Sequence, residues 1–144
     1  MSELERWQQE VSAWYLAKQH HQAEKLVNLV LDPPEEIWGP MITDGQSKAI
    51  ACWLDASLRL YRHYLAQQNA HKGYQYLNFA YSKLQQVYCN LSCQLELRQW
   101  AKQRLEHLIV LMLELCSQHD WHQEANQQID CHVRLLASYD LGAA

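Results

Sequence analysis

The sequence predicts an all-α protein of six helices arranged as three antiparallel hairpins. Apolar residues recur three or four positions apart in six stretches, which is the spacing of one face of a helix. Short polar turns separate the two helices of each pair, and short connections favour antiparallel neighbours. All three Pro and two of the four Gly lie between Pro33 and Gly45, so the remaining chain has almost no helix breakers.

The 144 residues are enough for a single helical domain over 1–144. Its hairpins are expected at about 2–31, 47–88 and 93–138, with one irregular connection at 32–46. Ser2-Glu3-Leu4-Glu5 fits a capping box at the first helix. Asp120-Trp121-His122-Gln123 fits another, which is expected to open the sixth helix. The fifth helix, from about Cys93 to Ser117, is apolar nearly all round over Leu108–Leu115, so this segment should be buried on several sides or contact a partner.

The irregular connection combines a helix-start signal with large apolar residues. Asp32-Pro33-Pro34-Glu35 can open about one turn of helix, which Gly39-Pro40 then ends. Ile37, Trp38, Met41 and Ile42 follow in a segment of a kind that usually lies on the surface. Two interpretations remain open, a flap that closes one end of the first hairpin or a segment that contacts a partner.

Charge and composition exclude several classes of protein. The formal charge of −4 and the absence of a basic stripe argue against nucleic-acid binding. No run of 18 apolar residues is present, so no membrane span is predicted. Five cysteines are an odd number without a compact framework spacing, which indicates reduced thiols and a cytoplasmic location.

The turns of the three hairpins are alike in sequence. Tyr15-Leu16-Ala17-Lys18-Gln19 is matched 49 residues later by Tyr64-Leu65-Ala66-Gln67-Gln68. His119-Asp120-Trp121 with Ala125 is similar to the turn of the tetratricopeptide family, so the chain resembles a tetratricopeptide-like helical-hairpin repeat. It departs from that family in its period near 50 rather than about 34 and in its lack of turn glycines. The resemblance implies an open array with a concave groove for a peptide or a partner helix; a compact helical bundle is the alternative.

Eight histidines raise the question of a metal site. Cys116, His119 and His122 are the tightest cluster, and thiolate with imidazole suits zinc. The capping box at Asp120 places a turn between His119 and His122, and no Cys-x-x-Cys pair accompanies them. No metal and no cofactor are therefore predicted.

An enzyme site is not predicted either. Polar residues on apolar helical stretches are few, namely Asp55, His63, His107 and Glu114. Asp55 can pair with Arg59 one helical turn later on the surface. Arg59 and His63 lack the spacing of helical ribonucleases with an Arg-x4-6-His motif. The sequence also contains no glycine-rich phosphate loop.

The function expected from these features is a non-enzymatic protein–protein interaction module, such as a helical adaptor or a chaperone-like protein of bacteria. A partner peptide or helix would bind in an aromatic-lined groove. The candidate partner-binding residues are Trp38, Trp53, Tyr61, Tyr74 and Tyr81. One alternative is a regulatory or structural subunit, or a homo-oligomer, that associates through an apolar helix face such as Leu108–Leu115. Another is a helical bundle that binds a small ligand.

Overall fold

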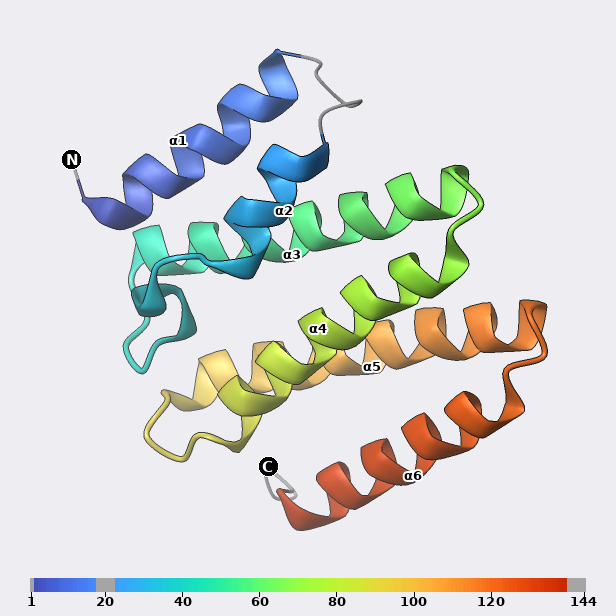
Figure 1. Cartoon of the computed structure of the whole chain (residues 1–144). Helices are drawn as coiled ribbons and strands as arrows, with labels where there is room; N and C mark the ends of the chain where they lie inside the picture. The colour runs from blue at the N-terminus through green and yellow to red at the C-terminus, as the bar shows by residue number, and fades with distance from the viewer. Residues whose placement is uncertain (1, 18–22, 140–144) are drawn as a thin grey trace. The chain divides into compact units, whose positions relative to one another are not determined.

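The computed structural model of the chain describes residues 2–17 and 23–139, and within these ranges it is all-α, as predicted (Figure 1). The described residues form six α-helices and one short 3₁₀ helix, η1, with no strand. The elements are α1 (Glu3–Leu16), α2 (Ala23–Leu31), η1 (Glu35–Trp38), α3 (Asp44–Ala66), α4 (Ala70–Cys89), α5 (Leu95–Gln118) and α6 (His122–Ser138).

The chain divides into two compact units, Met1–Tyr76 and Leu77–Ala144, and the boundary falls within α4. The first unit contains α1, α2, η1, α3 and the first turns of α4. The second contains the rest of α4 with α5 and α6. The expected single domain over 1–144 stays a prediction.

In the first unit, α1 and α2 run antiparallel and both pack against α3 (Figure 1). Ser2 caps α1 by accepting a hydrogen bond from the backbone N–H of Glu5 at 3.1 Å, as the capping box predicts. Thr43 caps α3 in the same way by accepting from the N–H of Gln46 at 3.0 Å. The largest buried apolar side chains of these helices are Leu4, Trp7, Val11, Trp14, Leu26, Val30, Ile50, Trp53, Leu54, Leu60 and Tyr64.

Two tryptophans, one from α1 and one from α3, donate hydrogen bonds to the C-terminal end of α2. A helix leaves its last four carbonyl groups without intrahelical partners, and N–H groups four residues later would normally serve them. For Leu29 and Val30 those later residues are Pro33 and Pro34, which have no N–H. The indole N–H of Trp7 donates to the carbonyl of Leu29 at 2.8 Å, and that of Trp53 donates to Val30 at 3.0 Å. We call these two bonds the indole clamp.

The connection between α2 and α3 folds back onto α3. Ile37 in η1 is fully buried, and the buried side chain of Gln46 donates to its carbonyl at 2.8 Å. The ring of Trp38 meets that of Trp53 edge-on, with centroids 4.8 Å apart. Met41, by contrast, is 62% exposed. These contacts support the flap interpretation for Ile37 and Trp38 and leave Met41 at the surface.

In the second unit, α5 and α6 pack antiparallel (Figure 1). The apolar second half of α5 is mostly internal, because Leu108, Ile109, Met112 and Leu115 are all buried. Val110 points outward and is 53% exposed. The segment therefore behaves mainly as a core helix, which is the first of the two expectations for it.

Three expected helix starts differ from the structure. The third helix begins at Asp44 rather than about Ser47, because Thr43 supplies its cap. The fifth begins at Leu95 rather than Cys93, because the N–H of Cys93 bonds to Asn90 in a turn. Asp120 was expected to cap the sixth helix, and that expectation is wrong.

Asp120 instead ends α5. Its φ is 56°, in the left-handed region, and Trp121 is the N-terminal flanking residue of α6, with no side-chain capping bond. The N–H of Trp121 bonds back to Cys116, and that of Asp120 to Ser117, which is the paired pattern of a Schellman motif. Gln68 ends α3 with the same pattern and a φ of 58°. The turns after α3 and α5 thus share one geometry without glycine.

We predict that replacing either clamp residue by Phe destabilises the fold. Trp53→Phe keeps an aromatic ring but leaves the buried carbonyl of Val30 without its donor, which costs about 1–3 kcal/mol. Trp7→Phe should cost less, because its hydrogen bond is only partly buried. The free energy of unfolding from urea titration measures both effects.

Trp100→Phe is the control for the change in ring size. Trp100 is half-buried, and no indole hydrogen bond is found for it among the described residues. If Trp53→Phe cost no more than Trp100→Phe, the clamp would have no energetic role.

Candidate functional site

Three hollows adjoin one another in the first unit, around the ends of α1, α2 and α3. Hollow A, about 510 Å³, lies between α1 and α2; hollow B, about 320 Å³, between α1 and α3; and hollow C, about 650 Å³, among α2, α3 and the start of α4. Each pair shares one lining residue: Trp14 joins A to B, Lys25 joins A to C, and His63 joins B to C. A fourth hollow of about 340 Å³ shares Glu10 and Leu29 with hollow A alone, and Glu3, Asp32 and Glu35 make its lining mainly acidic. Hollows A, B and C are treated as one site because each of them shares a residue with both of the others.

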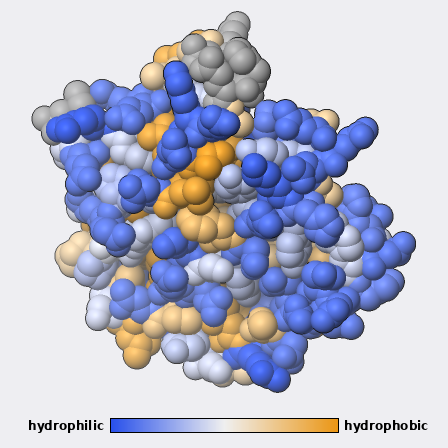
Figure 2. Space-filling model, viewed as in Figure 1, coloured by the Kyte–Doolittle hydropathy of each residue, from blue (hydrophilic) through white to orange (hydrophobic). Residues whose placement is uncertain are grey.

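The wall of hollow A is apolar on one side. It is formed by Ala13, Trp14, Ala17 and Leu29, which come from successive turns of α1 and from α2. Figure 2 shows an apolar strip in the part of the view where α2 lies, on a face that is otherwise largely hydrophilic. The site thus offers an apolar contact surface as well as polar groups.

The rim of the site carries several lysines and arginines together with one histidine. Arg59, Arg62 and His63 line hollow B, and Lys72 joins His63 in lining hollow C. With Lys25, five basic residues surround the three hollows, and Glu10 and Glu24 are the acidic residues among the lining. Within the described part of the chain, Lys25, Arg62 and Lys72 take part in no ion pair. Their charges remain available to a ligand.

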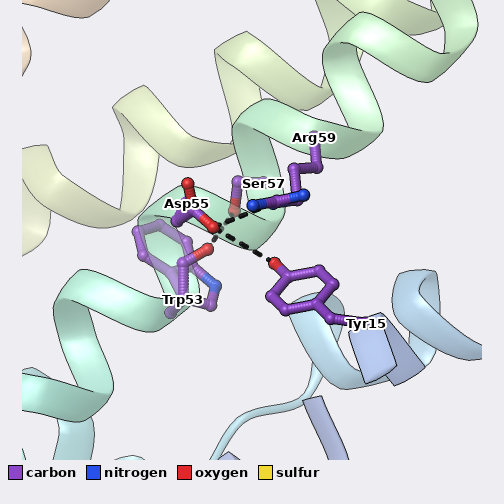
Figure 3. A network of polar contacts seen from close by, with 5 residues as sticks. All are labelled: Tyr15, Trp53, Asp55, Ser57 and Arg59. Carbon is purple, nitrogen blue, oxygen red and sulfur yellow. Dashed lines mark hydrogen bonds and ion pairs between the residues drawn. The ribbon is translucent and has the colours of Figure 1, made fainter. Parts of the chain in front are cut away.

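Arg59 is held by a small polar network (Figure 3). Its Nε donates to Asp55 Oδ2 at 3.0 Å, one helical turn away, which confirms the surface pair expected from the sequence. The hydroxyl of Tyr15 in α1 donates to the same oxygen at 3.3 Å, and the guanidinium lies 4.2 Å from the centre of the Tyr15 ring. Burial raises the pKa of Tyr15 well above its usual value, and the negative charge of Asp55 raises it further. The tyrosine therefore stays a neutral donor.

Aromatic stacking orders the wall of hollow C. The rings of Tyr64 and Tyr76 lie parallel with centroids 5.4 Å apart, and the ring of His63 meets Tyr64 edge-on at 5.0 Å. The ammonium group of Lys72 sits 4.6 Å from the centre of the Tyr64 ring. Burial, followed by the neighbouring Tyr64, raises the pKa of Tyr76 to about 12. The stack holds Lys72 at the edge of the hollow.

The five aromatic residues predicted to bind a partner do not line this site. Trp53 is fully buried, and Trp38 packs edge-on against it. Tyr61 packs near Gly73, whose missing side chain leaves room for the backbone and ring of Tyr61. Tyr74 is half-buried, and Tyr81 is buried within the second unit. This burial makes Trp53 and Tyr81 core residues, and partner binding by the five stays a prediction.

The aromatic residues that line the hollows are Trp14 and Tyr64, and both are themselves buried, with exposed fractions of 8% and 7%. The sequence held one local signal for the site, because Arg59, Arg62 and His63 are spaced to share a helix face. Lys25 and Lys72 join them only through the packing of α2 and α4 near α3. No periodicity in a single segment could have indicated that.

The weak metal candidates are not assembled into a site. Cys116 is buried in α5, His119 flanks its end, and His122 opens α6 with its imidazole 3.9 Å from Asp120. Across residues 2–17 and 23–139, no group of three or more His, Cys, Asp or Glu side chains is placed to hold a metal ion.

A second polar cluster lies in the second unit. The hydroxyl of Tyr81 and Nδ1 of His132 share a hydrogen bond of 2.7 Å between α4 and α6. Burial raises the pKa of Tyr81 to about 12, and burial lowers the pKa of His132 despite the opposing charge of Glu106. Both shifts favour the neutral forms, so the pair acts as a structural hydrogen bond near neutral pH.

Comparison with known proteins finds no family model, no curated protein and no solved structure that matches this chain. The tetratricopeptide-like resemblance accordingly stays a prediction. None of the helices in the described ranges combines the length and the apolar character that crossing a membrane requires.

We predict that His132 makes the fold less stable in mild acid. Because its folded pKa lies below the unfolded value near 6.5, the unfolded chain takes up a proton first. The stability that neutral His132 contributes to the fold is fully present above about pH 6.5 and is lost as the pH falls below that value. His132→Gln removes the titration, so the melting temperature of the variant should fall less between neutral and mildly acidic pH. If the melting temperatures of the two proteins fell equally with pH, this titration could not be assigned to His132.

Proposed function

We propose that the protein is a non-enzymatic, cytoplasmic protein-binding module, a helical adaptor that holds a segment of a partner protein across hollows A, B and C. The observation that carries the proposal is the joining of the three hollows through Trp14, Lys25 and His63. Together they present an apolar wall beside a charged rim, which is the combination that peptide-binding grooves use.

The dimensions of the hollows favour a chain segment over a compact ligand. Each hollow alone, at about 320–650 Å³, matches the size of a small-molecule pocket. Their arrangement around α1, α2 and α3 spreads the contact surface over three helices. A peptide or helix can contact all three hollows at once, whereas a small ligand occupies one.

The chemistry of the lining supports recognition over catalysis. Among the described residues, the ionisable groups of the lining are lysines, arginines, His63, Tyr64 and the two glutamates, and neither Cys nor Ser is present there. Arg59 and Tyr64 are already engaged in the contacts described above. Such groups can orient a ligand, but they form no nucleophile–base pair. The five cysteines are all free thiols, which supports a reducing compartment.

One observation favours the alternative of a subunit that associates through an apolar face. Ile129 and Val133 lie one helical turn apart on α6 and are 45% and 59% exposed. Leu135 is the buried residue of that helix. A second association surface on α6 is compatible with an adaptor, because the hollows belong to the other unit.

The hollow A wall gives a direct test. The full chain is used to select from a displayed library of random short peptides, and the recovered peptides are titrated by fluorescence anisotropy. Ala13 is exposed and lines hollow A, so Ala13→Trp should fill the hollow and weaken binding about tenfold.

Ser12→Trp is the matched control, because Ser12 is the exposed neighbour of Ala13 on α1 and does not line the hollow. Binding should be unchanged in this variant. A library that yields no enriched peptide, or equal losses in the two variants, would rule out the hollows as the binding site.

A further inference from the structure

We infer that the partner segment bound at hollows A–C is acidic, with carboxylates that pair with the basic rim while apolar side chains contact Ala13, Ala17 and Leu29. This inference rests on the proposed function and names the chemistry of its partner. It follows from the distribution of charge around the hollows and from the way the chain already binds one carboxylate.

The positive charges are concentrated where the hollows meet. The chain carries 12 Lys and Arg against 16 Asp and Glu, yet among the described residues four Lys and Arg line these hollows against two Glu. A basic site on an acidic chain attracts an anionic partner locally and repels polyanions at a distance. The charge is therefore a property of the site and not of the surface as a whole.

The basic groups are spread along the site instead of converging on one point. Lys25 comes from α2, Arg62 and His63 from α3, and Lys72 from α4. A site dedicated to one phosphate or one carboxylate would gather its charged donors around a single point. Cations on three elements are suited to a segment that carries several carboxylates along its length, with the apolar wall between them.

The Asp55 network shows how a carboxylate is recognised at this rim. One oxygen of Asp55 accepts from Arg59 and from Tyr15, which come from α3 and α1. Arg62 lies one helical turn from Arg59 on the same helix and has no ion pair within the described residues. A carboxylate of the partner can bind Arg62 as Asp55 binds Arg59.

A nucleic acid would use the same cations but fits the site less well. Its backbone presents closely spaced phosphates and gains affinity by covering many basic residues at once. Glu10 and Glu24 interrupt this rim, and the chain has a net charge of −4. The apolar side of hollow A would also be left without a matching surface. An acidic peptide can pair with the cations of the rim and also place apolar side chains against hollow A.

The experiment begins with the peptides selected on the full chain from the random library. We expect enrichment of Asp and Glu flanking Leu, Phe or Trp. Raising NaCl from about 0.05 M to about 0.5 M should weaken the selected peptides severalfold, because it shortens the Debye length to a few ångströms. Peptide analogues with Asn and Gln in place of Asp and Glu should bind severalfold more weakly than the selected peptides.

Two charge variants should change the affinity in opposite directions. Arg62→Gln should weaken the acidic peptides about two- to fivefold, the size of an exposed charge pair. Asp55→Asn should strengthen them, because it releases Arg59 from its internal carboxylate. Lys48→Gln is the control; this exposed lysine lies on α3 outside the hollows and should have no effect.

The outcomes separate the inference from the proposed function. Enriched peptides that are not acidic, or that bind equally well to Arg62→Gln and at high salt, overturn the inference and leave peptide binding intact. A single-stranded oligonucleotide that displaces the peptides and binds more tightly also overturns it. If no peptide is enriched above the bait-free selection, the proposed function itself fails.

Discussion

The first unit depends on the two indole N–H groups that bond to the end of α2. Pro33 and Pro34 stop the helix, and they also remove the N–H groups that would have served Leu29 and Val30. A buried carbonyl without a donor costs free energy, so the helix can end inside the fold only if donors come from elsewhere. Trp7 and Trp53 provide them from opposite neighbours. Because the end of α2 takes one donor from α1 and one from α3, all three helices must pack together to satisfy its carbonyl groups.

The clamp also positions the candidate site. Trp14 follows Trp7 by seven residues, which is close to two helical turns, so both rings lie on nearly the same face of α1. Tyr64 follows Trp53 by eleven residues, or about three turns of α3. The clamp sets the axial register of both helices against α2. Trp14 and Tyr64 therefore reach the hollows as a consequence of bonds made two and three turns away.

Most of the fold could be predicted because its signals are local. Helical periodicity, the Ser2 cap and the Asp55–Arg59 pair each depend on residues within one or two turns. Asp120 was misjudged for a related reason, because an acidic residue before a helix can cap it or end the preceding one. The Schellman bonds to Cys116 and Ser117 decide in favour of the second role.

The site was harder to predict because its residues come from separate elements. Hydropathy marks Trp14 and Trp53 alike as residues of an apolar face, and it does not say which ring becomes a hydrogen-bond donor in the core. Only the missing donors at Pro33 and Pro34 require Trp53 to be internal. Lys25 and Lys72 belong to unremarkable helix starts until α2 and α4 bring them beside His63.

Internal hydrogen bonding accounts for several of the tyrosines and tryptophans in this chain. The chain contains six Trp and eight Tyr against one Phe. Several of their polar groups are used inside the units: Trp7 and Trp53 complete α2, Tyr81 bonds to His132, and the hydroxyl of Tyr88 bonds to the carbonyl of Tyr139. A phenylalanine could fill these positions but could not donate a hydrogen bond.

Aromatic content is consequently weak evidence for a binding surface in this protein. Rings whose N–H or O–H groups are consumed in the core are unavailable to anchor a partner in this conformation. The groups exposed at the hollows are the apolar side chains of Ala13, Ala17 and Leu29 and the cations without ion pairs among the described residues. In the proposed binding mode, discrimination among partners depends mainly on charge, and charge recognition at an exposed rim is sensitive to salt in a way that burial of aromatic anchors is not.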